Sequence, residues 1–150
     1  MGYRGHIGKT LLRTAVVALA ALLFGATPTV RAATNTWNGA SGGDWTGGTW
    51  SSGVYNAGTT NRFTNTTLTV NLNLSTNTAG ILLNGTAGTI TITNDNNTLT
   101  ITGYGINIAT NATLNLNVGT VTLGAAQTWT ATNGATLFVG ARVNNRPTKL

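Results

Sequence analysis

Residues 89–118 read TITITNDNNTLTITGYGINIATNATLNLNV, and this stretch decides the class of fold. Its apolar residues stand largely on every second position, with threonine and asparagine between them. Such alternation is typical of strands that bury one face, and β-branched threonine favours the same conformation. The pattern extends over residues 63–140, and after residue 32 no segment of ten residues has the 3.6-residue period of a helix. The chain beyond residue 32 is therefore predicted to be all-β.

The alternating runs recur at a nearly constant interval. Three series of apolar residues are spaced by 22 to 25 positions. They are Leu68, Ile90, Leu114 and Leu137; then Ile81, Ile106 and Trp129; and finally Leu99 and Val121. Three interleaved series with one period predict three short strands per coil of a parallel β-helix, in which stacked coils bury a central column of side chains. A β-sandwich, which also uses short strands at close intervals, is the alternative.

Composition favours the β-helix and limits the chemistry of the chain. Only 7% of the residues are charged, against roughly 25% in an ordinary soluble domain. Asparagine and threonine can hydrogen-bond from coil to coil, whereas stacked like charges repel each other. The chain has no Cys, no Glu, one His and two Asp. We therefore expect no enzyme activity, no cofactor and no metal site, because these need ionisable groups that the sequence lacks.

The two acidic residues, Asp44 and Asp95, are interpreted as turn residues. Asp44 lies in a glycine-rich stretch, and Asp95 lies among asparagines. Asx side chains are common turn formers. Nothing in the pattern brings the two carboxylates together as the acid pair of a glycosidase.

The first 32 residues have the three-part pattern of a secretory signal peptide. Basic residues precede an apolar run at positions 15–24 (AVVALAALLF), and Val30 and Ala32 offer small residues for cleavage after Ala32. The run is shorter than the roughly 20 residues that span a bilayer. We therefore expect export to the cell surface or the extracellular space, with membrane contact only through this segment. The remainder has four basic and two acidic residues, which provides no basic face for nucleic acid.

The rest of the chain is predicted to divide into three parts. Residues 33–62 are rich in Gly, Ser, Thr and Trp and are predicted to form an N-terminal cap. Residues 63–140 are predicted to form the coils. Residues 141–150 (ARVNNRPTKL) are predicted to be an irregular basic tail.

Four aromatic residues are the candidates for ligand binding. Trp37, Trp45, Trp50 and Tyr55 lie within twenty positions of each other. Exposed Trp and Tyr rings are flat apolar surfaces that stack on sugar faces, and neighbouring Asn and Thr could bond to sugar hydroxyls. A glycan-binding module is therefore one hypothesis for function. The preferred interpretation is that the rings cover the end of the first coil.

Residues 119–140 (GTVTLGAAQTWTATNGATLFVG) carry a resemblance to a known family. They resemble the autotransporter-associated β-strand repeats of bacterial autotransporter passengers, in which VTLG-x-x-QTW precedes a Gly-Ala-Thr-Leu strand. Residues 97–118 are similar to a preceding coil, and residues 36–50 to the start of a mature passenger. The resemblance covers nearly all of residues 34–140. It implies a right-handed β-helix on or outside the cell, associated with the outer membrane in a full-length protein, and it brings no catalytic residues.

The resemblance implies a structural function with a role in adhesion. The expected partners are surface glycans or the surfaces of host or neighbouring cells. Such passengers continue through many coils to a membrane anchor, whereas here the pattern ends near Gly140. The chain is therefore expected to be a truncated or frameshifted N-terminal fragment. Its open last coil is expected to self-associate through unpaired strand edges.

Overall fold

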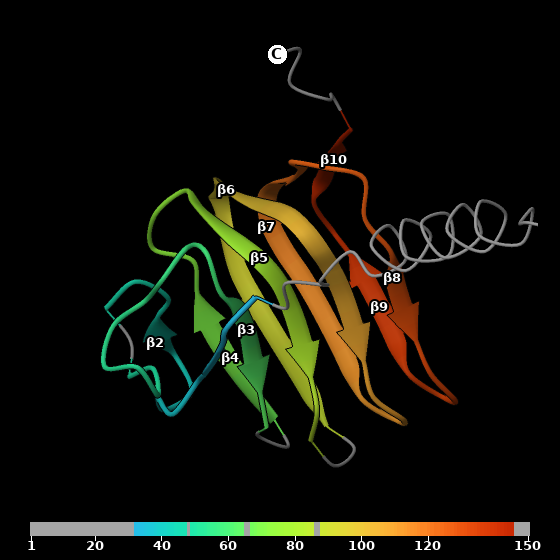
Figure 1. The fold of residues 1–150 in the computed structure, drawn as a ribbon, viewed down its shortest axis with the longest axis horizontal. Helices are drawn as coiled ribbons and strands as arrows, with labels where there is room; N and C mark the ends of the chain where they lie inside the picture. Colours follow the sequence, from blue (N-terminus) through green and yellow to red (C-terminus); the bar gives the residue numbers. More distant parts are fainter. Residues whose placement is uncertain (1–31, 48, 65–66, 86–87, 146–150) are drawn as a thin grey trace, which may run out of the picture. The chain divides into compact units, whose positions relative to one another are not determined.

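A computed structural model describes residues 32–145 except positions 48, 65–66 and 86–87 (Figure 1). The predicted signal peptide, apart from Ala32, and the last five residues lie outside the described residues. The described part contains ten strands and no helix. The strands are β1 (Thr34–Thr36), β2 (Gly43–Asp44), β3 (Thr60–Phe63), β4 (Thr67–Asn71), β5 (Thr76–Leu83), β6 (Thr89–Ile108), β7 (Thr113–Leu123), β8 (Trp129–Ala131), β9 (Thr136–Val139) and β10 (Arg142–Asn144).

Parallel pairing between successive coils builds three strand columns. The first column contains β1, β3, the second half of β5, the end of β6, and β8. The second contains β2, β4, the start of β6, the start of β7, and β9. The third contains the start of β5, the middle of β6, the end of β7, and β10. The first column has five strands in chain order, so the described residues make five coils, which follow one another across the stack (Figure 1).

This arrangement is a β-solenoid and confirms the predicted class of fold. The β-sandwich alternative is wrong, because a sandwich is built from antiparallel sheets. Every pairing between named strands of the described chain is parallel.

The register confirms the three series of apolar residues. Each member of a series stands directly opposite the next member, one coil further along the chain. The rows are Leu68, Ile90, Leu114 and Leu137 in the second column; Ile81, Ile106 and Trp129 in the first; and Leu99 and Val121 in the third. The recurrence read from the sequence is therefore the coil period itself.

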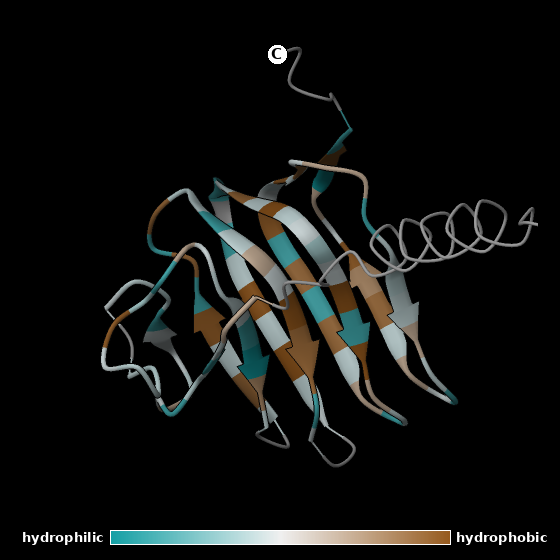
Figure 2. Cartoon of the chain, viewed as in Figure 1, coloured by the Kyte–Doolittle hydropathy of each residue, from teal (hydrophilic) through white to brown (hydrophobic). Residues whose placement is uncertain are grey.

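The apolar rows form the core of the solenoid. Hydrophobic and hydrophilic residues alternate along the strands, as Figure 2 shows in brown and in white to teal. Ile92, Leu99, Ile106 and Leu114 have no exposed surface. Complete burial of a Leu or Ile side chain contributes about 1.5–3 kcal/mol. The inward rows are therefore the main source of stability.

Polar side chains bond from coil to coil, as the composition predicted. Asn94 Nδ2 donates to Asn71 Oδ1 over 3.4 Å, and Asn71 Nδ2 donates to Asp44 Oδ1 over 2.7 Å. Asn115 Nδ2 donates to Thr91 Oγ1 over 3.4 Å. These contacts join residues 23 to 27 positions apart. Amide and hydroxyl groups can thus hydrogen-bond to the next coil and can also be solvated on the outer surface.

One corner of the solenoid requires glycine. Gly105 has φ +68°, a conformation that L side chains rarely adopt. A Cβ atom at this position would lie 2.0 Å from the carbonyl oxygen of Thr128 on the next coil. The absence of a side chain therefore lets the fourth and fifth coils approach at this corner.

The predicted boundaries differ from the structure at both ends of the coil region. Residues 33–62, predicted as a cap, contain β1 and all of β3 except Phe63, and these are paired strands of the first column. The predicted irregular tail begins at residue 141, but Arg142–Asn144 form β10 and pair with β7. Val143 stands opposite Val121, exactly one period later. The basic composition of the tail obscured this last repeat.

Candidate functional site

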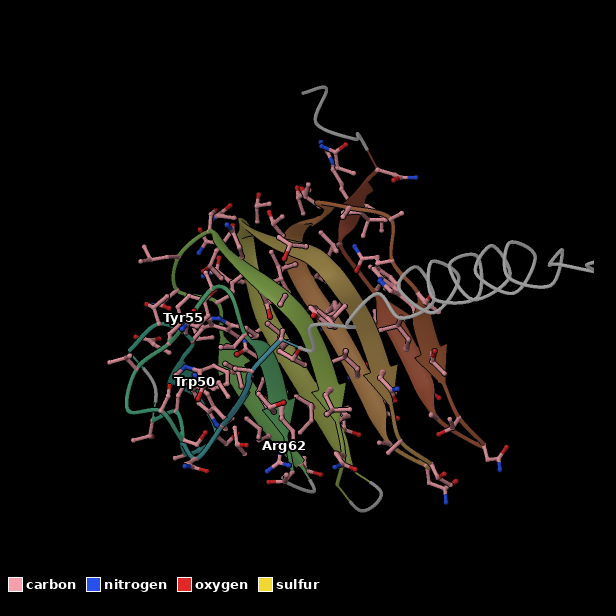
Figure 3. The ribbon with its side chains drawn as sticks, viewed as in Figure 1. Trp50, Tyr55 and Arg62 are labelled. Carbon is pink, nitrogen blue, oxygen red and sulfur yellow. The ribbon has the colours of Figure 1, made fainter. Side chains whose placement is uncertain are left out.

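The four aromatic residues singled out in the sequence all belong to the first coil. Trp37 follows β1 and forms an isolated antiparallel bridge with Trp50. Trp45 follows β2, and Tyr55 lies in the connection to β3. Trp50 and Tyr55 lie together beside the first strands in Figure 3. The chain around the first coil therefore gathers these rings at one end of the solenoid.

The rings form one packed cluster with Phe63 of β3, and we call these five residues the aromatic cap. The ring centroid of Trp50 lies 5.0 Å from that of Trp37 and 5.4 Å from that of Trp45, both in edge-to-face geometry. Phe63 lies 6.0 Å from Trp50, and Tyr55 lies 6.1 Å from Trp45. Edge-to-face pairs contribute about 0.5–1.5 kcal/mol beyond their burial. Because Phe63 is a residue of the second coil, the cluster fixes the first coil onto the stack.

Burial of the three indoles overturns the prediction of a sugar-stacking platform. Trp37 is 1% exposed, Trp45 0% and Trp50 3%. A ring stacks on a sugar through an exposed face, and these rings have none. Tyr55 is half-buried and packs against the same cluster. The geometry instead matches the preferred interpretation, in which the rings cover the first coil.

The hydrogen bonding of the indole N–H groups indicates that packing, and not polar contact, holds this cluster together. Trp50 Nε1 donates to the carbonyl oxygen of Trp45 over 2.8 Å. Within the described residues, Nε1 of Trp37 is buried and has no hydrogen-bond partner. An unsatisfied buried donor costs about 1–3 kcal/mol. Burial of the rings has to offset this cost, as expected of a structural cluster rather than a polar binding site.

A hydrogen-bonded loop covers the outer edge of β1 beside the cap. Ser51 N donates to the carbonyl oxygen of Thr36 over 2.8 Å, and Thr36 N donates to Ser51 Oγ over 2.9 Å. Asn35 is 1% exposed, and its Nδ2 donates to the carbonyl oxygen of Val54. Its Oδ1 accepts from Ser51 Oγ and Ser52 N, each over 3.1 Å. These bonds occupy the edge at which another strand could otherwise pair.

Sequence reasoning missed the residues that hold this loop in place. Asn35 pairs in register with Asn61, which is also fully buried and whose Nδ2 donates to Thr78 Oγ1 over 3.1 Å. The sequence signal for these contacts was the presence of two asparagines on an inward row, because an inward polar residue needs a specific hydrogen-bond partner. The partner itself could not be read from the periodicity.

Burial raises the pKa of Tyr55, and a hydrogen bond with the Thr76 hydroxyl, at 2.8 Å, partly opposes this shift. A raised pKa means that the folded state favours the protonated phenol. This contribution to stability is complete below the unfolded pKa of about 10 and is lost as pH rises through the higher folded pKa.

We expect the free energy of unfolding of the wild type to fall in that alkaline range. The free energy of unfolding of Tyr55→Phe should fall less steeply, because the variant has no phenol to titrate. Denaturant titrations at several pH values measure the slope, and Tyr104→Phe, at an exposed tyrosine, is the matched control.

The two acidic residues differ in their backbone setting. Asp44 ends β2, and Asp95 lies within β6, where the register with β7 shifts between Asn94 and Thr98. Strand β4 lies between β2 and the start of β6. The expectation of a turn is therefore wrong for Asp44, which ends a short strand. Around Asp95 the chain turns a corner within β6, and Asn96 N donates to Asn94 Oδ1 over 3.1 Å, as in an Asx turn.

The described residues contain no cluster of three or more His, Cys, Asp or Glu side chains that could hold a metal ion. Among them, no helix is long and apolar enough to cross a membrane.

The fold and the cap define a β-solenoid with a covered first coil. In comparisons with family models, curated proteins and solved structures, no match was found. The class therefore rests on the parallel register and the coil period alone.

Proposed function

We propose that the chain is a structural β-solenoid segment of an exported, autotransporter-like surface protein, which provides length and surface and serves in adhesion. The observation that carries the proposal is the combination of five stacked coils in register with a covered first coil. Repeats of this kind extend a protein in one direction, and a terminal cap keeps the apolar column away from water.

The position of the first coil supports export with cleavage after Ala32. The carbonyl oxygen of Ala33 accepts a hydrogen bond from Thr60 N over 2.9 Å, and β1 begins at Thr34. Cleavage after Ala32 would leave these contacts and the aromatic cap intact. The mature protein would then begin directly at its capped coil.

The outer surface suits a spacer with weak, distributed polar contacts. Thr67, Thr89, Thr113 and Thr136 stand opposite each other on four successive coils. The row is uncharged and at least partly exposed. In this proposal adhesion uses such polar rows, and the buried tryptophans have no part in binding glycans.

Cleavage of the N-terminal segment tests the proposal. After expression of the full chain in a Gram-negative bacterium, we expect mass spectrometry of the exported protein to show a product that begins at Ala33. Ala32→Tyr should block cleavage, because signal peptidase sites require small residues. Ala57→Tyr, the same change at an exposed turn position, should be processed normally. A wild-type product that stays inside the cell with residues 1–32 attached would contradict the proposal.

A further inference from the structure

The last coil has the same inward rows as the others but does not bury them fully. In the second column, Leu114 and Leu116 have no exposed surface, whereas Leu137 and Val139, directly opposite them on the last coil, are only partly buried. In the third column, Val121 is fully buried, whereas its partner Val143 is 52% exposed. The loss of burial therefore follows position in the stack and not residue type.

The strands of this coil also have free outer edges within the described chain. Each of β8, β9 and β10 pairs with one described strand, on the side of the preceding coil. We call their outer side the terminal edge. Strands β8 and β9 contain no charged residue, and β10 contains only Arg142. Charged residues are one common protection of an edge strand, and among the described residues these three strands have only Arg142 to provide it.

The two ends of the solenoid differ in this respect. At the first coil, Ser51 occupies the hydrogen-bonding groups of Thr36, and the aromatic cap covers the apolar column. A terminal edge therefore cannot pair with β1 of another molecule, and on the first coil only the two-residue β2 keeps an unpaired side among the described strands. Head-to-tail contacts, which would generate filaments, are blocked by the cap.

We propose that the terminal edge pairs with the terminal edge of a second copy, giving a two-fold symmetric dimer with the aromatic caps at its far ends. The contact would place apolar rows against apolar rows, as the interfaces between successive coils of one chain do. A two-fold axis across the stack reverses strand direction, so the new pairs are antiparallel. The contact is isologous and stops at two copies. This inference does not depend on export.

A charge at the terminal edge tests the contact. Sedimentation of the protein purified after expression of the full chain should show a monomer that converts to a dimer as concentration rises, with no larger species. Val143→Lys should remain monomeric at concentrations at which the wild type is dimeric, because it places an ammonium group in the apolar interface. Val143 is already half exposed, so the fold should tolerate the change. Val54→Lys, at a residue 66% exposed in the first coil, should dimerise as the wild type does.

Spin labels test the polarity of the dimer. The sequence contains no cysteine, so Thr130→Cys in the last coil and Thr34→Cys in the first each provide a single site. We expect a short label-to-label distance for position 130 and a long one for position 34. A wild type that is monomeric at all concentrations, or that grows into filaments, would overturn the proposal. Equal dimerisation of Val143→Lys and wild type would overturn it as well.

Discussion

Replacing Trp45 with alanine is expected to lower the free energy of unfolding by about 3–5 kcal/mol, the usual cost of a large aromatic side chain in a core. Trp45 has no exposed surface, and its ring contacts those of Trp50, Tyr55 and Phe63. Its carbonyl oxygen accepts the indole N–H of Trp50. The neighbouring rings cannot close the space without losing their contacts with β3. Denaturant unfolding followed by far-UV circular dichroism measures the loss.

A matched replacement separates the cap from tryptophan content. Trp129→Ala removes the same side chain from the last coil, where it is only partly buried and packs at the margin of the core. We expect a clearly smaller loss of stability there. If Trp45→Ala were as stable as the wild type but lost retention on a glycan column, the aromatic cap would be a sugar site after all.

Most of the fold could be predicted because the apolar residues repeat with the period of one coil. Leu114 and Leu137 recur at the coil interval, and each alternates with a polar neighbour that must face the other way. A shift of one residue would turn every apolar side chain outward, so the pattern admits one register. Strand β10 was missed because its three residues carry one apolar position between Arg142 and Asn144, and so short a run shows no alternation by itself.

The candidate site could be located from the sequence, but its exposure could not. Clustering of Trp37, Trp45 and Trp50 in a glycine-rich segment is visible without a structure. Whether the rings face water depends on the loop that closes over them. That loop is held by Asn35 through bonds to residues 16 to 19 positions away, and these contacts occur once. The sequence period predicts contacts that recur from coil to coil, and the contacts of the cap occur in one coil only.

Leu114→Ala and Leu137→Ala form the second comparison with a large expected effect. The two leucines stand opposite each other on β7 and β9 and occupy the same inward row. Leu114 has coils on both sides and no exposed surface, whereas Leu137 is only partly buried. We expect Leu114→Ala to lower the free energy of unfolding by about 2–5 kcal/mol, since the next coil holds the cavity open. Leu137→Ala should cost clearly less, because part of its surface is already in water.

The comparison is informative because residue type, strand column and register are held constant. Only the covering coil differs, so the difference between the two losses measures what one additional coil contributes to burial. Unfolding should be measured at low protein concentration, where the solenoid is monomeric. At higher concentration the loss for Leu137→Ala should increase, because dimerisation covers this side chain and the variant weakens the contact. Equal losses at low concentration would mean that the last coil is already covered in the single molecule, and the terminal edge would then have no role in assembly.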